Sequence, residues 1–240
     1  MKTSNKLLIV AILIIIVSMV TYDFALRAEY LKGDYKSRFY NMKSLDLKNF
    51  KTVDNRVANL VEVNIEKGEK FAIWIDKDLK DNLNVSQNGT DLVIDIADKK
   101  NLKNKNYNGK ISIICPSIDK VSTSPFFYEK ANVIEYEPNS TCNIKGFNQQ
   151  DLTLIINKST HLSFGKNQIE NLKATVGDDK SKYAYLFIAS TNKIDDAAIK
   201  VAGKNQLSIE NAKIGKSNFT ISDSAQVSLS GSFLNKLIQQ

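Results

Sequence analysis

Two series of apolar residues recur in the second half of the chain at a nearly constant spacing, and this repeat limits the fold more than any other feature. The first series advances by about 20 residues per step, with one longer step after Ala174: Ile113, Val133, Leu154, Ala174, Ile199 and Phe219. The second also advances by about 20 residues per step, with its longer step after Leu162: Val121, Cys142, Leu162, Leu186, Leu207 and Val227. Both longer steps span one place, GDDKSK (177–182). A single loop insertion that lengthens two independent series is expected of a wound chain and not of unrelated hairpins.

Most members of both series have an apolar partner two residues later, as in Ile113 with Cys115 and Leu162 with Phe164. Two inward side chains per short strand, without an intervening helix, are typical of a parallel β-solenoid, in which each winding buries its inner face on the next. Pro116 would mark the corner between KISIIC (110–115) and DKVSTS (119–124), since proline has no N–H for a sheet. The prediction is an all-β, parallel β-helix or solenoid-like head with about 20 residues per winding, preceded by one N-terminal transmembrane helix.

The segment before the repeat also alternates apolar and polar residues with a period of two, which predicts strands. The strand candidates are LVEVNIE (60–66), KFAIWID (70–76) and DLVIDIA (91–97). Gly68 interrupts the first pair, and Asn88-Gly89 is a strong tight-turn signal before the third strand. KDLKDNL (77–83) predicts a short helical turn.

The amino terminus carries a run of apolar residues, LLIVAILIIIVSMV (7–20), in which Ser18 is the one polar residue. This run is an export segment, either a cleavable signal peptide or an uncleaved signal anchor. The anchor is favoured because Ala25 and Ala28 lack a small residue two positions earlier, as cleavage would need. Lys2 and Lys6 would stay in the cytoplasm, so the rest would be exported.

Three segments are therefore predicted: a signal anchor over 1–26, a juxtamembrane stalk over 27–44 and a β-solenoid head over 45–236. The stalk, RAEYLKGDYKSRFYNMK (27–43), mixes basic and aromatic residues. It is either a simple spacer or a strip that lies on anionic lipid headgroups.

The head resembles the auto-transporter adhesin head GIN domain, a DUF2807-type domain of bacterial envelope proteins. The resemblance rests on LVEVNIEKGEKFAIWIDKDLKDNLNVSQNGTDLVIDI followed by GKISIICPSIDKVSTS, with Gly68, Asn88-Gly89 and Pro116 at the corresponding turns. It spans roughly 45–234 and is clear over 60–124. The chain departs from the family in having Lys, Asn and Ser at most corners, with LSGS (229–232) the nearest match, and in its predicted anchor. The resemblance implies binding at the surface or envelope, and it supplies no active-site residues.

The sequence contains no recognisable catalytic or metal-binding pattern. The one histidine, His161, has no serine or cysteine nucleophile at a recognisable elbow, and the acidic pairs Asp178-Asp179 and Asp195-Asp196 are placed in or near loops. No arginine follows Arg56, and no CxxC occurs. The net charge of +7 comes almost entirely from dispersed lysine, which argues against nucleic-acid binding. We therefore expect no enzyme, no cofactor and no metal.

Phe126, Phe127 and Tyr128 form the most apolar stretch that follows a corner, and they are the candidate contact surface, with packing over the side or end of the solenoid as the alternative. Trp74 fits the outward or the inward side of its strand, depending on register, and packing in the core is favoured. Cys115 and Cys142 fall on inward positions, as buried free thiols or, in an exported protein, as a disulfide.

The predicted function is that of a single-pass bacterial membrane protein whose non-catalytic, adhesin-like head binds or scaffolds in the periplasm or at the cell surface. The expected partners are membrane lipid at the N-terminal helix, an envelope protein or a glycan, and a second copy of the chain at the solenoid edges. The alternatives are a polysaccharide-active enzyme on a β-helix and an accessory protein of envelope signalling.

Overall fold

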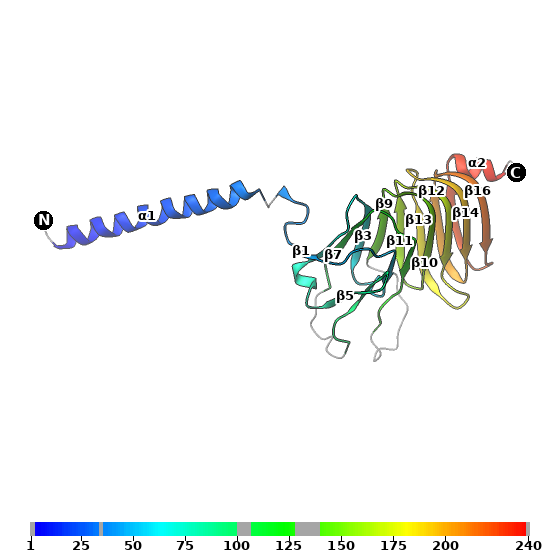
Figure 1. The fold of residues 1–240 in the computed structure, drawn as a ribbon, viewed down its shortest axis with the longest axis horizontal. Helices are drawn as coiled ribbons and strands as arrows, with labels where there is room; N and C mark the ends of the chain where they lie inside the picture. The colour runs from blue at the N-terminus through cyan, green and yellow to red at the C-terminus, as the bar shows by residue number, and fades with distance from the viewer. Residues whose placement is uncertain (1–2, 34–35, 100–106, 128–139, 239–240) are drawn as a thin grey trace. The chain divides into compact units, whose positions relative to one another are not determined.

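The structure is a computed structural model that describes residues 3–33, 36–99, 107–127 and 140–238. The chain divides into two compact units, Met1–Met42 and Lys43–Gln240, which we call the helical unit and the strand unit. Figure 1 shows both, with the later strands of the strand unit lying side by side in the order of their colours.

The helical unit is built on one long helix, α1 (Thr3–Lys32), which is exposed on every side. By length and composition α1 can cross a membrane, with a mean hydropathy of 2.6 over its most apolar stretch. The hydroxyls of Ser18 and Thr21 donate to the carbonyls of Ile15 and Val17, at 2.8 and 2.7 Å, so they need no water. The helix continues beyond the predicted boundary at residue 26 as far as Lys32, which lies just before Gly33 with its positive φ of 70°.

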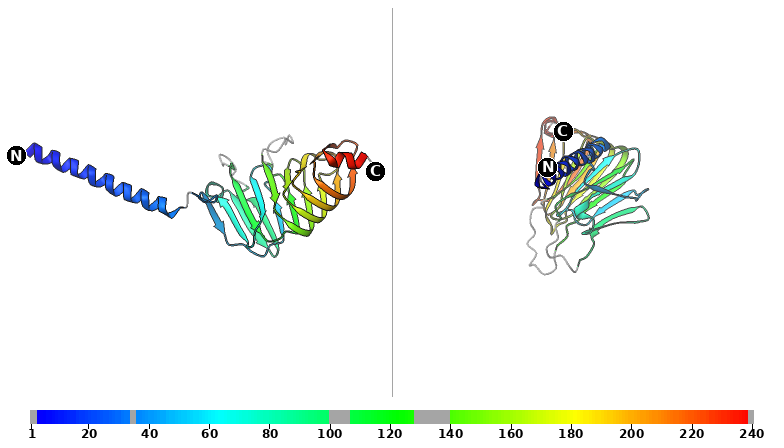
Figure 2. Two further views of the ribbon diagram at one scale, coloured as in Figure 1. Left: turned by 90° about the horizontal axis from the view of Figure 1, so that it is seen from above. Right: turned by 90° about the vertical axis from the view of Figure 1, so that its left-hand side faces the viewer.

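The strand unit consists of two sheets, which Figure 2 shows from two further directions. Sheet A has nine strands in the order β1 (Met42–Leu45), β4 (Ala72–Asp76), β7 (Lys110–Cys115), β3 (Glu62–Lys67), β9 (Thr141–Lys145), β11 (His161–Gly165), β13 (Lys182–Ile188), β15 (Lys204–Glu210) and β17 (Gln226–Ser230). Sheet B has eight strands in the order β16 (Lys213–Ile221), β14 (Lys193–Val201), β12 (Gln168–Val176), β10 (Asn148–Ile156), β8 (Lys120–Thr123), β2 (Thr52–Asn55), β6 (Asp91–Ile96) and β5 (Leu83–Asn88). Two short helical segments, η2 (Lys77–Leu79) and α2 (Ser232–Ile238), complete the unit.

From β7 onward, successive strands of the described chain alternate between the two sheets, and their pairing follows the predicted spacing over most of its length. In sheet B the residues in register are Leu154, Ala174, Ile199 and Phe219. In sheet A they are Cys142, Leu162, Leu186, Leu207 and Val227. The predicted loop insertion at 177–182 falls between the end of β12 at Val176 and the start of β13 at Lys182. The inward side chains of both sheets form one apolar core.

The first members of the two predicted series are in the wrong sheets. Ile113 lies in sheet A, where Ile65 is its partner on β3 and Ile73 its partner on β4. Val121 lies in sheet B, between Val53 and Leu154. The prediction failed because β3 and β4, from the first part of the chain, occupy both positions beside β7, while β8 lies between the early strand β2 and the later strand β10. Val133, the predicted neighbour of Ile113, lies outside the described residues.

The strand unit is also mixed and not purely parallel. β4 pairs with β7 antiparallel, and β5 pairs with β6 antiparallel across the tight turn that Asn88-Gly89 predicts. β3 and β4, consecutive in sequence on either side of Gly68, are separated in sheet A by β7. The predicted helical turn in 77–83 is the short segment η2. The observed architecture is therefore mostly β, with two mixed sheets that contain many parallel strands.

Candidate functional site

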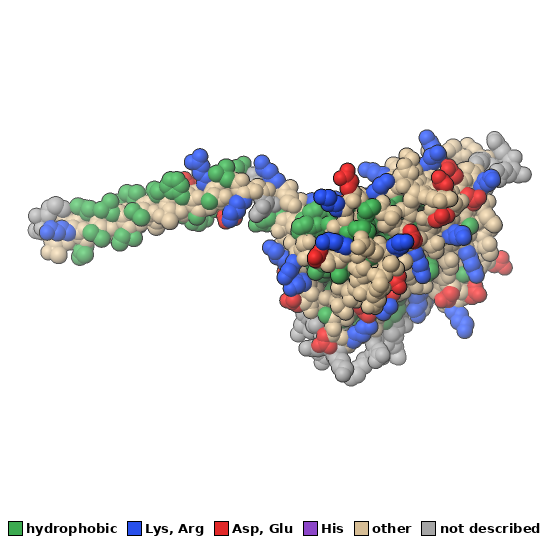
Figure 3. Space-filling view, viewed as in Figure 1, with side chains coloured by type: hydrophobic (Ala, Val, Ile, Leu, Met, Phe, Trp, Pro, Cys, Tyr) green, Lys and Arg blue, Asp and Glu red, His purple; other side chains and the backbone are tan. Residues whose placement is uncertain are grey.

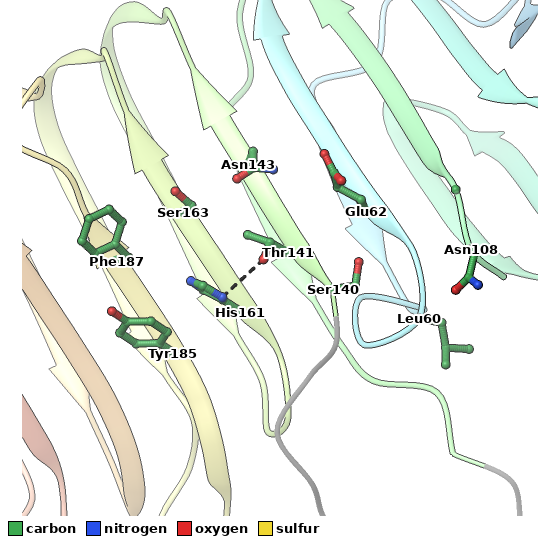
Figure 4. A pocket seen from close by; sticks show the side chains of 11 residues that line it. Leu60, Glu62, Asn108, Ser140, Thr141, Asn143, His161, Ser163, Tyr185 and Phe187 are labelled. Carbon is green, nitrogen blue, oxygen red and sulfur yellow. Dashed lines mark hydrogen bonds between the residues drawn. The ribbon is translucent and has the colours of Figure 1, made fainter. Parts of the chain in front are cut away.

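A groove of about 710 Å³ lies on the outer face of sheet A (Figure 4). Its lining comes from the middle of the sheet and from the ends of two neighbouring loops. The described lining residues are Leu60, Glu62, Asn108, Gly109, Ser140, Thr141, Asn143, His161, Ser163, Tyr185 and Phe187. A volume of this size is usual for small-ligand sites in proteins.

Aromatic side chains form one side of the groove. On β13, Ala184, Leu186 and Ile188 are buried in the core, so the alternation of the strand turns Tyr185 and Phe187 to the outer face, where both are half-buried. The ring of Tyr185 lies 4.5 Å from the ring of His161, its register partner on β11, at an interplanar angle of 33°. Figure 4 shows Tyr185 and Phe187 next to each other on the same strand, with His161 beside them.

A chain of polar side chains crosses the sheet on the other side of the groove. Asn143 Nδ2 donates to Asn64 Oδ1 at 3.0 Å, and Asn64 Nδ2 donates to Glu62 Oε1 at 2.7 Å. A carboxylate at the end of such a chain orients the amides, because the charge strengthens the hydrogen bond that it accepts. The groove therefore presents fixed amide and carboxylate groups opposite its aromatic side.

His161 connects the aromatic and polar sides. Its Nδ1 lies 3.3 Å from the hydroxyl of Thr141, while its Nε2 is enclosed and has no hydrogen-bond partner among the described residues. Burial lowers the pKa of His161 below its usual value, so the ring is neutral at pH 7. Glu62 is thus the one charged side chain among the described lining residues.

The predicted contact surface at 126–128 does not line this groove. The backbone N–H of Phe126 donates to Asn59 Oδ1 at 2.8 Å, and its carbonyl accepts from Asn59 Nδ2 at 3.0 Å. The ring of Phe126 packs against the core, and the ring of Phe127 lies 5.6 Å from Lys158 Nζ. Both side chains are half-buried, and Tyr128 lies outside the described residues.

The remaining residues considered from the sequence are dispersed. Trp74 is half-buried and lies on the opposite side of β4 from the core residues Ile73 and Ile75, which differs from the predicted core position. Asp195 and Asp196 are inside β14 and not in a loop, and Asp195 Oδ1 lies 3.7 Å from the exposed Lys193 Nζ. No group of three or more His, Cys, Asp or Glu that could hold a metal ion occurs within the described ranges.

Both cysteines are buried free thiols. Burial raises the pKa of Cys115 and of Cys142 to about 12, so neither is a reactive thiolate at neutral pH. They lie on β7 and β9, which β3 separates in sheet A. Two strand spacings amount to about 9.6 Å, and a disulfide needs Cα atoms within about 7 Å. The disulfide alternative therefore does not fit this fold.

Of the described lining residues, the sequence pattern singles out His161 alone; the aromatic residues Tyr185 and Phe187 lie at outward positions, which the two inward series do not include. The usable signal is that Tyr185 and Phe187 are aromatic where β13 should be polar, in KYAYLFI. The same spacing that pairs Leu162 with Leu186 places His161 beside Tyr185.

The sequence matches no protein-family model and no curated protein. Among solved structures, it is similar in fold to a "putative adhesin" from Parabacteroides distasonis ATCC 8503, with a TM-score of 0.58 and 10% identity over 78% of this chain and 73% of that one. A "putative adhesin" from Bacteroides fragilis NCTC 9343 gives a TM-score of 0.48, with 11% identity over 79% of this chain and 96% of that one. A "putative lipid binding protein" from Parabacteroides distasonis ATCC 8503 gives 0.40, with 12% identity over 80% of this chain and 94% of that one. At these identities the first of the three shows a shared fold, and the other two are too distant for any argument.

Proposed function

We propose that this chain is a bacterial cell-envelope protein that α1 holds in the membrane and whose non-catalytic, adhesin-like strand unit binds a partner at the envelope. The observation that carries the proposal is the fold shared with the Parabacteroides distasonis protein that is called a "putative adhesin". The function in that name is proposed for this chain and is supported by a groove suited to binding on the outer face of sheet A. The GIN domain family (DUF2807-type) is proposed on the same grounds.

The proposed architecture of the head is a parallel β-solenoid. It is supported by the alternation of strands between sheets A and B and by the parallel register of the strands from β9 to β17 within each sheet. The antiparallel pairs of β4 and β5 would then cap the first windings. The proposed division of the chain remains an anchor at 1–26, a stalk at 27–44 and a head at 45–236.

The proposed localisation is a bacterial membrane, crossed once by α1, with the strand unit in the periplasm or at the cell surface. It is supported by the apolar surface of α1 and by Lys2 and Lys6, which precede the apolar run at 7–20 and which the positive-inside rule keeps in the cytoplasm. On the face in Figure 3, Lys and Arg side chains alternate with Asp and Glu over the strand unit, which fits an envelope protein better than a nucleic-acid binder.

The proposed partners are membrane lipid around α1, an envelope protein or a glycan at the strand unit, and a second copy of the chain. Self-association is supported by the end of the sheets, where β16 and β17 are edge strands and Ile221 is 40% exposed.

Protease treatment of spheroplasts tests the topology. The full chain is produced with a C-terminal epitope tag. Before protease is added, the cell-associated band should have the mass of the uncleaved chain, and with protease but no detergent the tag should be digested. Replacing Leu13 and Ile14 by Lys should release the chain from the membrane fraction, because charges at the helix centre cost about 2.5–3.5 kcal/mol each. A tag that is protected until detergent is added would contradict the proposal.

A co-sedimentation assay tests the binding role. The full chain in detergent is mixed with lipid-free envelope fragments, and saturable binding that unlabelled chain displaces is expected. If the chain has the expected topology but does not bind the fragments, the proposed membrane anchor stands and the proposed adhesin-like role is contradicted.

A further inference from the structure

We infer that the groove on the outer face of sheet A is a binding site for a neutral carbohydrate chain, which stacks on Tyr185 and Phe187. The inference rests on the proposed function, for which it names the site and the class of ligand.

The aromatic side of the groove offers two rings on one strand against which a sugar ring can pack. Tyr185 and Phe187 are two residues apart on β13, so their side chains leave the sheet about 6.6 Å from each other. The ring of His161 packs against the ring of Tyr185 across the sheet, with 4.5 Å between centroids and an interplanar angle of 33°, and so fixes the orientation of Tyr185. The faces of aromatic rings carry partial negative charge, and the C–H groups on one face of a sugar ring are weakly positive and apolar, so the two pack favourably.

The polar side supplies the groups that sugar hydroxyls need. Glu62 and the Asn143 carbonyl oxygen accept hydrogen bonds, and Thr141 and Ser163 have hydroxyls that both donate and accept. The chain from Asn143 through Asn64 to Glu62 holds the amides in place before a ligand arrives. Such preorganisation lowers the entropic cost of binding.

The charge of the groove selects a neutral ligand. The described lining residues include no Lys or Arg, His161 is neutral, and Glu62 would repel an anion. Lys110, the backbone partner of Glu62 on β7, is not among the described lining residues. The outer face of sheet B differs, because Lys173, Lys200 and Lys216 are exposed there. A uronate or phosphate-bearing polymer would therefore find no cation among the described lining residues of the groove.

The test measures binding of soluble oligosaccharides to the full chain in detergent by calorimetry. The neutral probes are maltohexaose, cellohexaose, chitohexaose and mannohexaose, and the anionic probe is hexagalacturonate. We expect at least one neutral probe to bind with a Kd of about 0.01–1 mM. Tyr185→Ala and Phe187→Ala should each weaken that binding at least tenfold, while Tyr185→Phe should keep it within threefold.

The matched control is Tyr183→Ala. Tyr183 lies on the same strand but is not among the described lining residues, so its removal should leave the affinity unchanged. Thermal unfolding identifies any variant that fails to fold. In that case Ser163→Arg replaces it in the test: Ser163 is half-buried on the outer face, and an arginine there should fill the groove and block binding.

Three results would overturn the inference: no probe binds, the anionic probe alone binds, or a neutral probe binds equally well to the Ala and Arg variants. The co-sedimentation assay with lipid-free envelope fragments distinguishes a failure of this inference from a failure of the proposed binding function. If the fragments bind the wild-type and Tyr185→Ala chains alike, the groove is not the site, although the binding role stands.

Discussion

The carboxamide of Asn192 and the backbone of Asn167, which comes earlier in the chain, are joined by a buried hydrogen bond. Asn192 Oδ1 accepts from the Asn167 N–H at 3.1 Å, and Asn167 Oδ1 in turn accepts from the Phe147 N–H at 3.0 Å. Each residue lies in a turn that leads from sheet A to sheet B. The turns are thus linked through the protein interior by side chains that satisfy backbone groups out of reach of water.

Asn192→Ala should destabilise the strand unit. Asn192 Nδ2 also donates to the carbonyls of Phe164 and Ala189, both at 2.7 Å. The substitution leaves the buried N–H of Asn167 without its acceptor and removes one of the two hydrogen bonds that each carbonyl accepts. We expect the free energy of unfolding, measured in urea by circular dichroism, to fall by about 2–4 kcal/mol. Asn218→Ala, on the exposed face of β16, is the control and should change it by less than about 0.5 kcal/mol. Equal effects of the two substitutions would refute the role of Asn192.

Gly177→Ala should be more harmful than Gly89→Ala, although both glycines have positive φ, at 67° and 61°. A Cβ on Gly177 would lie 1.9 Å from Asn205 Nδ2, whereas a Cβ on Gly89 has nothing within 4 Å. The Gly89 variant measures backbone strain alone, about 1 kcal/mol. The Gly177 variant adds a clash with a buried amide that donates to Ser181 and Ala202. Thermal unfolding should rank the two in this order, and the reverse order would show that the loop at 177–181 adapts freely.

The two thiols should be unreactive in the native chain. Because burial raises the pKa of both Cys115 and Cys142 to about 12, almost no thiolate is present at pH 8. Iodoacetamide should modify neither residue in the native chain and both in urea, as read by intact mass. Rapid native labelling, or a mass deficit of two hydrogens in the protein from the envelope, would contradict the buried free thiols.

The stability of the strand unit should fall as the pH is lowered from 7.5 to 5.5, in part through His161. The folded-state pKa of His161 is lowered by burial, so the unfolded chain binds a proton at a pH where the folded chain does not. The stability from this group is complete above the unfolded pKa of about 6.5 and is lost as the pH falls toward the folded pKa. His161→Gln should reduce the loss between the two pH values, and an identical loss in both chains would exclude this contribution.

The repeat was predictable from the sequence because it depends on spacing alone. Inward residues recur at nearly constant intervals between Cys142 and Val227, and the structure pairs them in that register. The loop insertion at 177–182 was predictable for the same reason, since it lengthens two series at once.

The start of the strand unit was not predictable in the same way. Ile113 and Val121 fit the spacing of the wrong series, and the choice of sheet depends on β2 and β3, which come much earlier in the chain. Pairing between strands so far apart in the sequence depends on which sheet edge is free to accept a strand. The alternation of apolar and polar residues within one strand does not contain that information.

The candidate site also has a part that the sequence could predict and a part that it could not. The aromatic residues Tyr185 and Phe187 are unusual in their own strand, and the repeat places His161 beside Tyr185. The chain from Asn143 to Glu62 needs β3 beside β9, a contact between residues 79 positions apart for Asn64 and Asn143.

By itself, the sequence determined an apolar helix, a set of short alternating strands and the register in which the later ones lie together. These features follow from the side-chain pattern within one or two strands, where burial of one face selects the conformation. The tertiary structure decided which strands of the first half enter each sheet, that the sheets are mixed, and that a groove forms where β3, β9, β11 and β13 meet. Those outcomes depend on the competition of distant segments for the same sheet edge, which is settled when the whole core is packed.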